Sequence, residues 1–229
     1  MTGESSASGS ANQDGGMNSE LRSELLRRVE KDQAARSLPE RDRETVLAVD
    51  AENLPWLKTV VAEVGWPGRS MVGADGAHAA WLLAQHADRD PAFQRRCLDL
   101  LTEAVRHGEA TVIELAYLTD RVLLAEGQPQ EYGTQMTGGE HGWAPRNLRD
   151  PDNVDERRAA VGLGPVSEYI VRITRSEGPP GPASITCLDC GEGIDVWLPD
   201  EGEARDIRCA ACGWTTTVTV GRPPGEPDR

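Results

Sequence analysis

Two pairs of cysteines, each with a two-residue gap, constrain the C-terminal part of this 229-residue chain more than any other feature. Eighteen residues separate the pairs, a spacing that is typical of zinc ribbons. A tetrahedral zinc ion takes four ligands with Zn–S distances of about 2.3 Å, and a two-residue gap lets both sulfurs of a pair face one ion. A glycine follows each pair, where a tight turn asks for a positive φ. The sequence therefore predicts one structural Zn²⁺ per chain, bound by Cys187, Cys190, Cys209 and Cys212.

The chain around these cysteines, residues 184–220, is expected to form a small β module. Residues 194–198 and 214–220 are rich in β-branched and aromatic side chains, which predicts two strands. So short a segment buries little apolar surface, and the metal would therefore supply its folding energy. A redox-active C-x-x-C motif or a chance pairing is the alternative interpretation. A catalytic zinc is disfavoured, because four thiolates leave no coordination position open.

The charge of this ribbon decides which partners suit it. It has seven acidic side chains against two basic ones, namely Asp189, Glu192, Asp195, Asp200, Glu201, Glu203 and Asp206 against Arg205 and Arg208. Four thiolates and one Zn²⁺ would add two further negative charges, which makes contact with phosphates unfavourable. We therefore expect a protein partner for the ribbon and no nucleic acid.

The whole chain is acidic as well, with a formal net charge of −14 and a pI near 4.7. Sequence-independent binding to nucleic acid or to an anionic membrane needs a basic face, so the net charge argues against both. No stretch approaches the roughly 18 apolar residues of a membrane-spanning helix, and the N-terminus lacks the pattern of a signal peptide. Cysteines arranged for metal binding suit a reducing compartment. These features predict a cytoplasmic protein.

Hydrophobic periodicity predicts a mainly α protein: a compact multi-helix domain over residues 19–173, followed by the small β zinc ribbon. The expected helices cover residues 19–38, 41–64, 75–87, 91–107, 111–126, 155–161 and 166–173. Residues 1–18 are expected to be a disordered tail, with Met17 as an alternative start, residues 174–183 a Pro/Gly linker and residues 221–229 a second tail.

Local signals mark several ends of these helices. Ser19 is expected to cap the first helix, and Asp90 followed by Pro91 to begin the fourth. Asp50 and Pro55 are expected to punctuate the second helix, and Gly127 to end the fifth. Residues 127–153 show no periodicity, and connections of this length are usually functional or disordered.

Asp120 lies on the apolar face of the fifth helix and is expected to be buried. A buried carboxylate needs a partner, and Arg121, Arg157 and Arg158 are the candidates. The pair could be purely structural. The alternative is a catalytic acid or a substrate anchor, because perturbed carboxylates cluster at functional sites.

His86 is expected at the C-terminus of the third helix, pointing inward or lying at the rim. Asp88 could orient it as a general base. A lone histidine of this kind is more often a hydrogen-bonded structural group. His78 is not spaced to share a metal with it, so no second metal is predicted.

Polar residues and glycines recur in a definite order along the helical region. They are Asp32-Gln33-x-x-Arg36, Gly65-Trp66-Pro67-Gly68, Ala80-Trp81, Gln85-His86-Ala87-Asp88, Tyr117-Leu118-x-Asp120-Arg121, Gln130-x-Tyr132-Gly133-Thr134-Gln135 and Arg157-Arg158 before Val161-Gly162-Leu163. This order resembles an uncharacterised bacterial family, the domain of unknown function numbered 6624, from about Leu21 to Tyr169. The resemblance implies no reaction, but it implies that these polar residues belong to a shared pattern, which more often marks a pocket than a core. The ribbon lies outside it.

Two functions remain open at this point. The first is a zinc-binding interaction protein, whose helical domain binds a small polar ligand or a partner. The second is a metal-independent enzyme, such as a hydrolase or transferase, in which His86 is the general base, Asp88 orients it, Arg121 binds an anion and Tyr132 is a donor. Asp120 would belong to that site, and the loop that ends at Gln135 would close it. No nucleophile motif or phosphate-binding loop supports the enzyme.

Overall fold

The structure is a computed structural model that describes residues 17–37, 43–178, 180–181, 183–187, 189–197 and 204–219. The predicted tails at residues 1–16 and 221–229 lie outside this description, as do three of the acidic ribbon residues, Asp200, Glu201 and Glu203. The chain divides into two compact units, one that ends at Leu118 and one that begins at Thr119, and each is described by itself.

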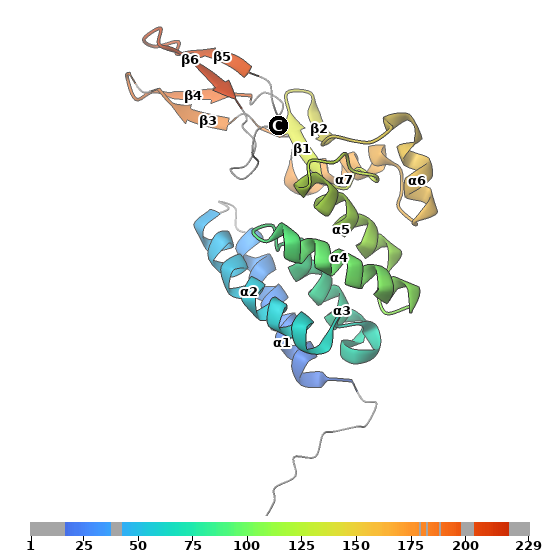
Figure 1. Cartoon of the computed structure of the whole chain (residues 1–229). Coiled ribbons are helices and arrows are strands. Elements are labelled where there is room, and N and C mark those ends of the chain that lie inside the picture. Colours follow the sequence, from blue (N-terminus) through green and yellow to red (C-terminus); the bar gives the residue numbers. More distant parts are fainter. Residues whose placement is uncertain are drawn as a thin grey trace, which may run out of the picture. The chain divides into compact units, whose positions relative to one another are not determined.

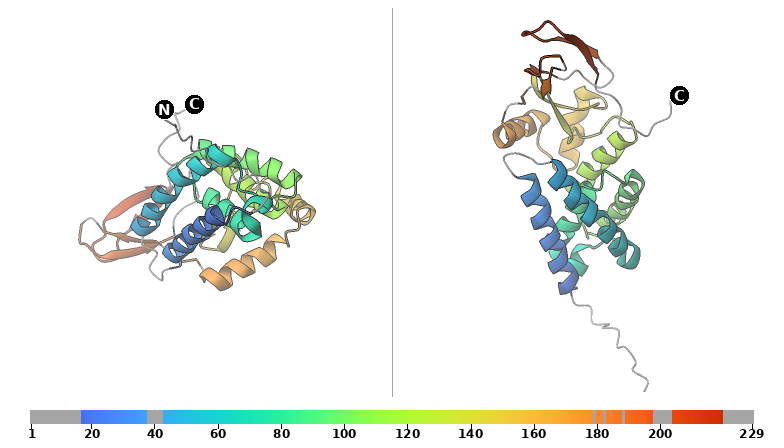
Figure 2. Two further views of the ribbon diagram at one scale, coloured as in Figure 1. Left: turned by 90° about the horizontal axis from the view of Figure 1, so that it is seen from below. Right: turned by 90° about the vertical axis from the view of Figure 1, so that its left-hand side faces the viewer.

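Helices make up the first unit (Figure 1): α1 Ser19–Arg36, α2 Arg43–Val64, α3 Arg69–Gln85, α4 Pro91–Arg106 and the first part of α5, Val112–Ala125. α1 packs against both α2 and α3, and Figure 2 shows α1 and α2 running side by side. Their shared core includes the fully buried side chains of Leu25, Leu57, Val72, Leu101 and Leu118. The first unit thus holds one continuous apolar core under polar outer faces.

Two helix starts show how local chemistry sets these boundaries. Asp90 precedes Pro91, and its side chain accepts a hydrogen bond from the Phe93 amide at 3.0 Å, as the sequence predicts for α4. At α1 the predicted serine cap is wrong. Asn18 is the capping residue, since its side-chain oxygen accepts from the Leu21 amide at 3.0 Å, and Ser19 is already helical.

Two other expectations about helix limits are corrected. α2 continues through Pro55 without a break, because the packing of its apolar face outweighs the hydrogen bond that proline cannot donate. α3 begins at Arg69, six residues before the predicted start, inside a stretch that reads as a Gly/Pro loop. The helix bends at Gly73, whose φ of 75° interrupts it and explains why the helical pattern is hard to read there.

The second unit begins in the last part of α5. The helix ends at Ala125, and Gly127 shortly after it has the predicted positive φ, here 70°. The segment without periodicity contains an antiparallel hairpin of β1 Met136–Gly139 and β2 Gly142–Pro145, which the sequence analysis missed. A 3₁₀ turn, Pro151–Asn153, leads into α6 Val154–Ala160, and α7 Val166–Glu177 packs against β2. Both short closing helices were predicted, but α7 runs further into the expected linker.

The ribbon consists of two antiparallel hairpins: β3 Ala183–Thr186 with β4 Gly193–Val196, and β5 Ala204–Arg208 with β6 Thr215–Thr219. β4 and β6 correspond to the two predicted strands, whereas β3 and β5 were not predicted. With seven α-helices and three small sheets in the described residues, the chain is mainly α, as expected. None of the helices in the described ranges is long and apolar enough to cross a bilayer.

Candidate metal centre and polar sites

The four cysteines of the ribbon converge on one point. Their sulfur atoms all lie within 4.8 Å of one another, and two pairs taken across the knuckles, Cys187 with Cys212 and Cys190 with Cys209, are each 3.7 Å apart. Sulfurs at about 2.3 Å from a central ion, in a regular tetrahedron, are about 3.8 Å apart. The spacing therefore fits a tetrahedral metal ion, and four thiolates would close its coordination shell.

Main-chain hydrogen bonds shape each knuckle in the same way. In the first, the Cys187 amide donates to Glu192 O at 2.8 Å and the Gly191 amide to Cys187 O at 3.0 Å. The second knuckle repeats this with Cys209 in place of Cys187. The glycine has a φ of 78° in the first knuckle and 80° in the second, the left-handed region that the turn requires. The repeated geometry indicates that each pair is built as a ligand turn.

The electrostatics at Cys187, but not at Cys190, whose pKa is raised, favour the thiolate that a metal needs. Burial acts to raise the pKa of the Cys187 thiol, but main-chain N–H groups of Cys190 and Asp189 donate to the sulfur and lower that pKa to about 7. Cys187 and Cys209 are buried, whereas Cys190 and Cys212 are exposed. Among the described residues, these four cysteines are the only group of three or more potential metal ligands whose ligand atoms lie this close to one another.

His86 occupies the predicted position at the C-terminus of α3, but its partner is different. Its Nδ1 lies 2.9 Å from Asp32 Oδ2 and 3.1 Å from Arg36 Nε, and both partners come from α1. Arg36 in turn forms an ion pair with Asp50 of α2 at 2.5 Å. The contact to α1 spans more than fifty residues and leaves no local pattern in the sequence. The orienting role of Asp88 stays a prediction.

The pKa values of the two carboxyl groups in this cluster, which consists of Asp32, Arg36, Asp50 and His86, depend on their neighbours. Burial acts to raise the pKa of the Asp32 carboxyl, yet hydrogen bonds from His86 and Gln33 and the charge of Arg36 hold that pKa below its ordinary value. Burial raises the pKa of Asp50, against the attraction of Arg36. Asp32 is 1% exposed and therefore lies in the core. Its lowered pKa favours the ionised carboxylate, which depends on the donors around it.

A small cavity of about 10 Å³ lies beside this cluster, lined by Asp50, Asn53, Leu54, Leu83, His86 and Ala87. That volume accommodates about one water molecule. Asn53 is 6% exposed; its Oδ1 accepts from Arg28 at 3.1 Å, but its Nδ2 is buried without a hydrogen-bond partner. A buried amide donor without a partner costs about 1–3 kcal/mol, so this cavity is a natural place for a polar group.

Asp88 belongs to a neighbouring structural contact. The fully buried Gln94 of α4 donates from Nε2 to Ala84 O, Gln85 O and Asp88 Oδ1, each at 3.1 Å. These bonds take up carbonyl groups at the C-terminal end of α3, which have no partner within the helix. Gln94 thus fixes the turn between the two helices, a role that the sequence analysis did not foresee.

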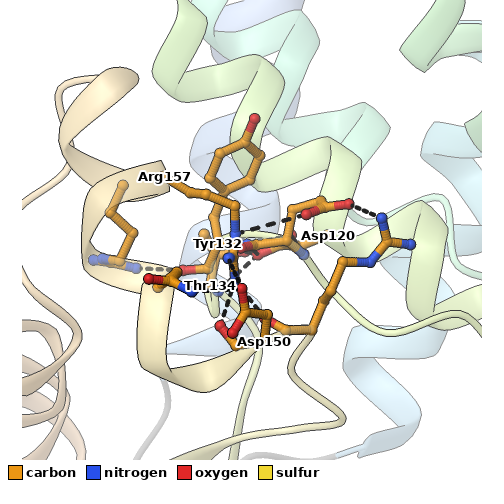
Figure 3. Close-up of polar contacts among 9 residues, drawn as sticks. Asp120, Tyr132, Thr134, Asp150 and Arg157 are labelled. Carbon is orange, nitrogen blue, oxygen red and sulfur yellow. Dashed lines mark hydrogen bonds and ion pairs between the residues drawn. The ribbon is translucent and has the colours of Figure 1, made fainter.

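Asp120 is buried, as predicted, and its carboxylate holds the loop that follows α5 (Figure 3). It accepts from the amides of Glu131 at 2.7 Å, Tyr132 at 3.0 Å and Thr134 at 2.8 Å, and from the Thr134 hydroxyl at 2.9 Å. Burial raises the pKa of Asp120, and these donors act in the opposite direction. The sequence suggested an arginine as the partner of Asp120. In the structure three main-chain amides and one hydroxyl group donate to the carboxylate.

The two arginines of α6 bind the same loop through its carbonyl groups. Arg157 donates to Glu131 O at 2.8 Å, and Arg158, which is 2% exposed, donates to Tyr132 O at 2.7 Å. Tyr132 therefore contributes main-chain groups to this network, and burial raises the pKa of its phenol. A carboxylate on one side and two guanidinium groups on the other fix the path of the loop.

Gln130 completes this loop network and was not among the predicted site residues. It is fully buried; its Nε2 donates to Gln135 O and Arg146 O, and its Oε1 accepts from the Gln135 amide at 3.0 Å. The Gln135 side chain donates to the Thr134 hydroxyl at 3.1 Å. The loop is thus held by side chains that satisfy its own backbone.

The predicted catalytic residues therefore fall into two groups. His86 and Asp88 belong to the first unit, whereas Asp120, Arg121, Tyr132 and Gln135 belong to the second. The structure brings Asp120, Tyr132 and Gln135 into one network. A single catalytic site formed by both groups stays a prediction. Asp32 and Arg36 were part of the family pattern, but Asp50 and Asn53 were missed, because polar residues on a long helix carry no signal of the cavity they line.

The fold and its sites define a class of protein: a mainly α-helical chain with a C-terminal ribbon of four cysteines that could hold a metal ion. The chain belongs to the family of unknown function DUF6624, whose model matches residues 19–178. The match covers the helices and the hairpin and ends before the first ribbon cysteine. No curated protein and no solved structure matches the chain.

Proposed function

We propose that the protein binds one structural Zn²⁺ in its ribbon and uses the acidic ribbon to dock a protein partner. The observation that carries the first part is the set of sulfur distances, 3.7 Å across each diagonal pair, which suits zinc with four thiolates. Zinc is preferred over iron because a lone tetrahedral thiolate site of this spacing in a small hairpin module is typical of structural zinc.

The metal would supply the folding energy of the ribbon. Apart from the cysteines, Val196 and Ile207 are the apolar side chains that are buried in its described residues. Two such side chains contribute on the order of 3–6 kcal/mol, far less than the entropy of ordering a module of this length. Metal binding and folding of the ribbon are therefore expected to be coupled.

Zinc per chain, measured by plasma mass spectrometry on the purified protein, tests this proposal. We expect one zinc in the wild type and none in a variant with Cys209→Ser and Cys212→Ser. Cys97→Ala is the matched control, because this buried cysteine of α4 lies outside the cluster and the variant should retain its zinc. A wild type without zinc, or a double variant that keeps it, would refute the proposal.

The docking role rests on charge. Asp189, Glu192, Asp195 and Asp206 are exposed on the described ribbon, where they face solvent rather than basic partners of the module itself. Such a surface favours a basic protein segment and repels phosphate groups. An arginine-rich peptide should therefore bind the wild type, and binding should weaken with salt.

Docking is tested with the variant Asp189→Asn, Glu192→Gln and Asp195→Asn, which keeps all four cysteines that would bind the metal. Calorimetry should show at least about tenfold weaker binding of the peptide, with one zinc per chain unchanged. Equal binding by the two proteins, or tighter binding to duplex DNA than to the peptide, would exclude the acidic ribbon as a protein-docking surface.

A second candidate function concerns the first unit, called the helical unit below, which would bind a small polar ligand and act on it without a metal. The specific observation in its favour is the cavity beside His86. Asn53 belongs to its lining and has a buried amide donor without a hydrogen-bond partner. The contact between His86 and Asp32 suits general acid–base chemistry.

A further inference from the structure

The two hydrogen-bond partners of His86 Nδ1 exclude each other. If Nδ1 carries a proton, it donates to Asp32, whose oxygens lie 3.0 and 2.9 Å away. If Nδ1 carries no proton, it accepts from Arg36 Nε, 3.1 Å away. The ring nitrogen that keeps the proton decides what His86 offers to a ligand, because a neutral imidazole has one donor and one acceptor.

The buried carboxylate selects between these states. In the second state an unprotonated Nδ1 would face Asp32 Oδ2 at 2.9 Å, with two lone pairs directed at each other in the core. In the first state that contact is a hydrogen bond, and Arg36 Nε keeps its own contact with Asp32 Oδ1 at 3.2 Å. Arg36 loses its hydrogen bond to His86 in this state, but it keeps Asp32 and Asp50 as acceptors. The first state is favoured, and it leaves Nε2 as an acceptor.

The lining of the cavity then defines the chemistry of its occupant. His86 contributes an acceptor, Asp50 a carboxylate and Asn53 an amide donor, while the other lining residues are apolar. With a neutral imidazole the two carboxylates outnumber Arg36, so the cluster has one net negative charge and disfavours an anion. A hydroxyl group, which both donates and accepts, satisfies this set and fits a space of one water molecule.

We propose that Asp32, His86 and the cavity beside them form a general-base site that takes a water molecule or the hydroxyl group of a neutral ligand. His86 is the residue that contacts the hydroxyl, Asn53 donates to its oxygen, and Asp32 and Arg36 are positioning residues. This inference rests on the second candidate function, the ligand site of the helical unit, and is independent of the metal in the ribbon.

The step that this arrangement supports is a proton transfer. The hydroxyl proton moves to His86 Nε2, the O–H bond breaks and an N–H bond forms, and the oxygen keeps the electron pair. Asp32 stabilises the imidazolium, and with its positive charge the cluster becomes neutral. With an ester as the acyl donor, the hydroxyl oxygen attacks the carbonyl carbon, the new C–O bond forms as the bond to the leaving alkoxide or phenolate breaks, and the proton on Nε2 returns to solvent.

The first test is the tautomer of His86, which nitrogen NMR of the labelled full-length protein reports at a pH where the ring is neutral. We expect the Nδ1–H form in the wild type and a shift towards Nε2–H in Asp32→Asn, whose side-chain amide can donate to Nδ1. Asp88→Asn should leave the tautomer as in the wild type. The Nε2–H form in the wild type would overturn the general-base site, since Nε2 could then accept no proton.

The second test uses p-nitrophenyl acetate as a small neutral probe and follows the release of p-nitrophenolate. We expect at least about tenfold less turnover in His86→Gln and an intermediate loss in Asp32→Asn, and a matched control, His78→Gln, should equal the wild type. His78 suits this purpose because its side chain is 57% exposed and contacts Glu114, away from the cavity lining. Turnover that does not depend on His86 would overturn the proposal.

A separate signal distinguishes this failure from failure of the ligand site itself. Glycerol, used as a neutral hydroxyl probe, should perturb the side-chain amide signals of Asn53 in the wild type. If those signals respond while the tautomer is Nε2–H, the ligand site stands and the base is overturned. If they do not respond, the site and the inference built on it both fail.

Discussion

At the scale of single residues, the chain places a few polar groups where burial makes their pairing decisive. Asp32 is the clearest case, because it is 1% exposed and depends on donors from α1 and α3. Asp32, Arg36 and His86 all belong to the residue order that resembles the family, but the separation of more than fifty residues between Asp32 and His86 hides their contact. Short-range spacing suggested Asp88 in its place, and in the structure Asp88 accepts a hydrogen bond from the Gln94 side-chain amide.

Asp32→Asn should change how stability depends on pH. The folded-state pKa of Asp32 is lowered, so its contribution is present above the unfolded value of about 3.9 and is lost as pH falls through the folded value. Denaturant unfolding of the wild type should therefore show stability falling below about pH 4, with a shallower fall in the variant. Asp99→Asn, at an exposed position of α4, is the control. Identical pH profiles for wild type and Asp32→Asn would contradict this account of Asp32.

Gly213 is a second residue whose identity is set by backbone geometry. Its φ of 80° lies in the left-handed region, where a residue with a Cβ costs about 1–2 kcal/mol. Gly213→Ala should therefore lower the zinc affinity of the ribbon about five- to thirtyfold, as measured by competition with a chelator. Gly181→Ala is the matched control, since its Cβ would meet open space at an ordinary φ. Unchanged zinc affinity in Gly213→Ala would show that the knuckle does not need this conformation.

At the scale of elements, the sequence predicted best where the signal is local. The start of α4 at Asp90 and Pro91 follows from two adjacent residues, and the structure agrees. α3 was predicted short because Gly73 breaks the periodicity, although packing on α1 carries the helix on both sides of the bend. The hairpin of β1 and β2 was missed because each strand has only four residues and three of these eight residues are glycines. Such strands depend on tertiary contacts rather than on propensity.

Asp120 accepts from three main-chain amides of the loop at residues 130–135, with which Arg157, Arg158 and Gln130 also form hydrogen bonds. Asp120→Ala would leave three buried amides without an acceptor, and each such group costs about 1–3 kcal/mol. We expect a loss of about 3–5 kcal/mol in unfolding free energy and faster amide exchange at Glu131, Tyr132 and Thr134.

Asp152→Asn provides the control for this loop, because Asp152 is exposed in the 3₁₀ turn and its substitution should change stability by less than about 0.5 kcal/mol. A mild effect of Asp120→Ala with unchanged exchange would mean that the loop has other supports. That result would favour the predicted catalytic role of Asp120 over a structural one.

At the scale of the whole molecule, the chain joins a family domain to a module outside it. The family match ends at residue 178, whereas the ribbon cysteines begin at Cys187. We propose separate tasks for the two parts, a small neutral ligand for the first unit and a metal and a basic partner for the ribbon. The ribbon was predictable because four ligands and two glycines fix its geometry within about thirty residues. The helical site was not, because its members come from three helices.

X-ray absorption at the zinc edge of the purified full-length protein tests the central claim, a closed four-thiolate centre, most directly. The account predicts a single shell of four sulfur atoms at about 2.3 Å and no nitrogen or oxygen ligand. A shell that includes lighter atoms, or an average of fewer than four sulfurs, would show that the cysteines do not enclose the metal. An open coordination position would then contradict a purely structural ribbon.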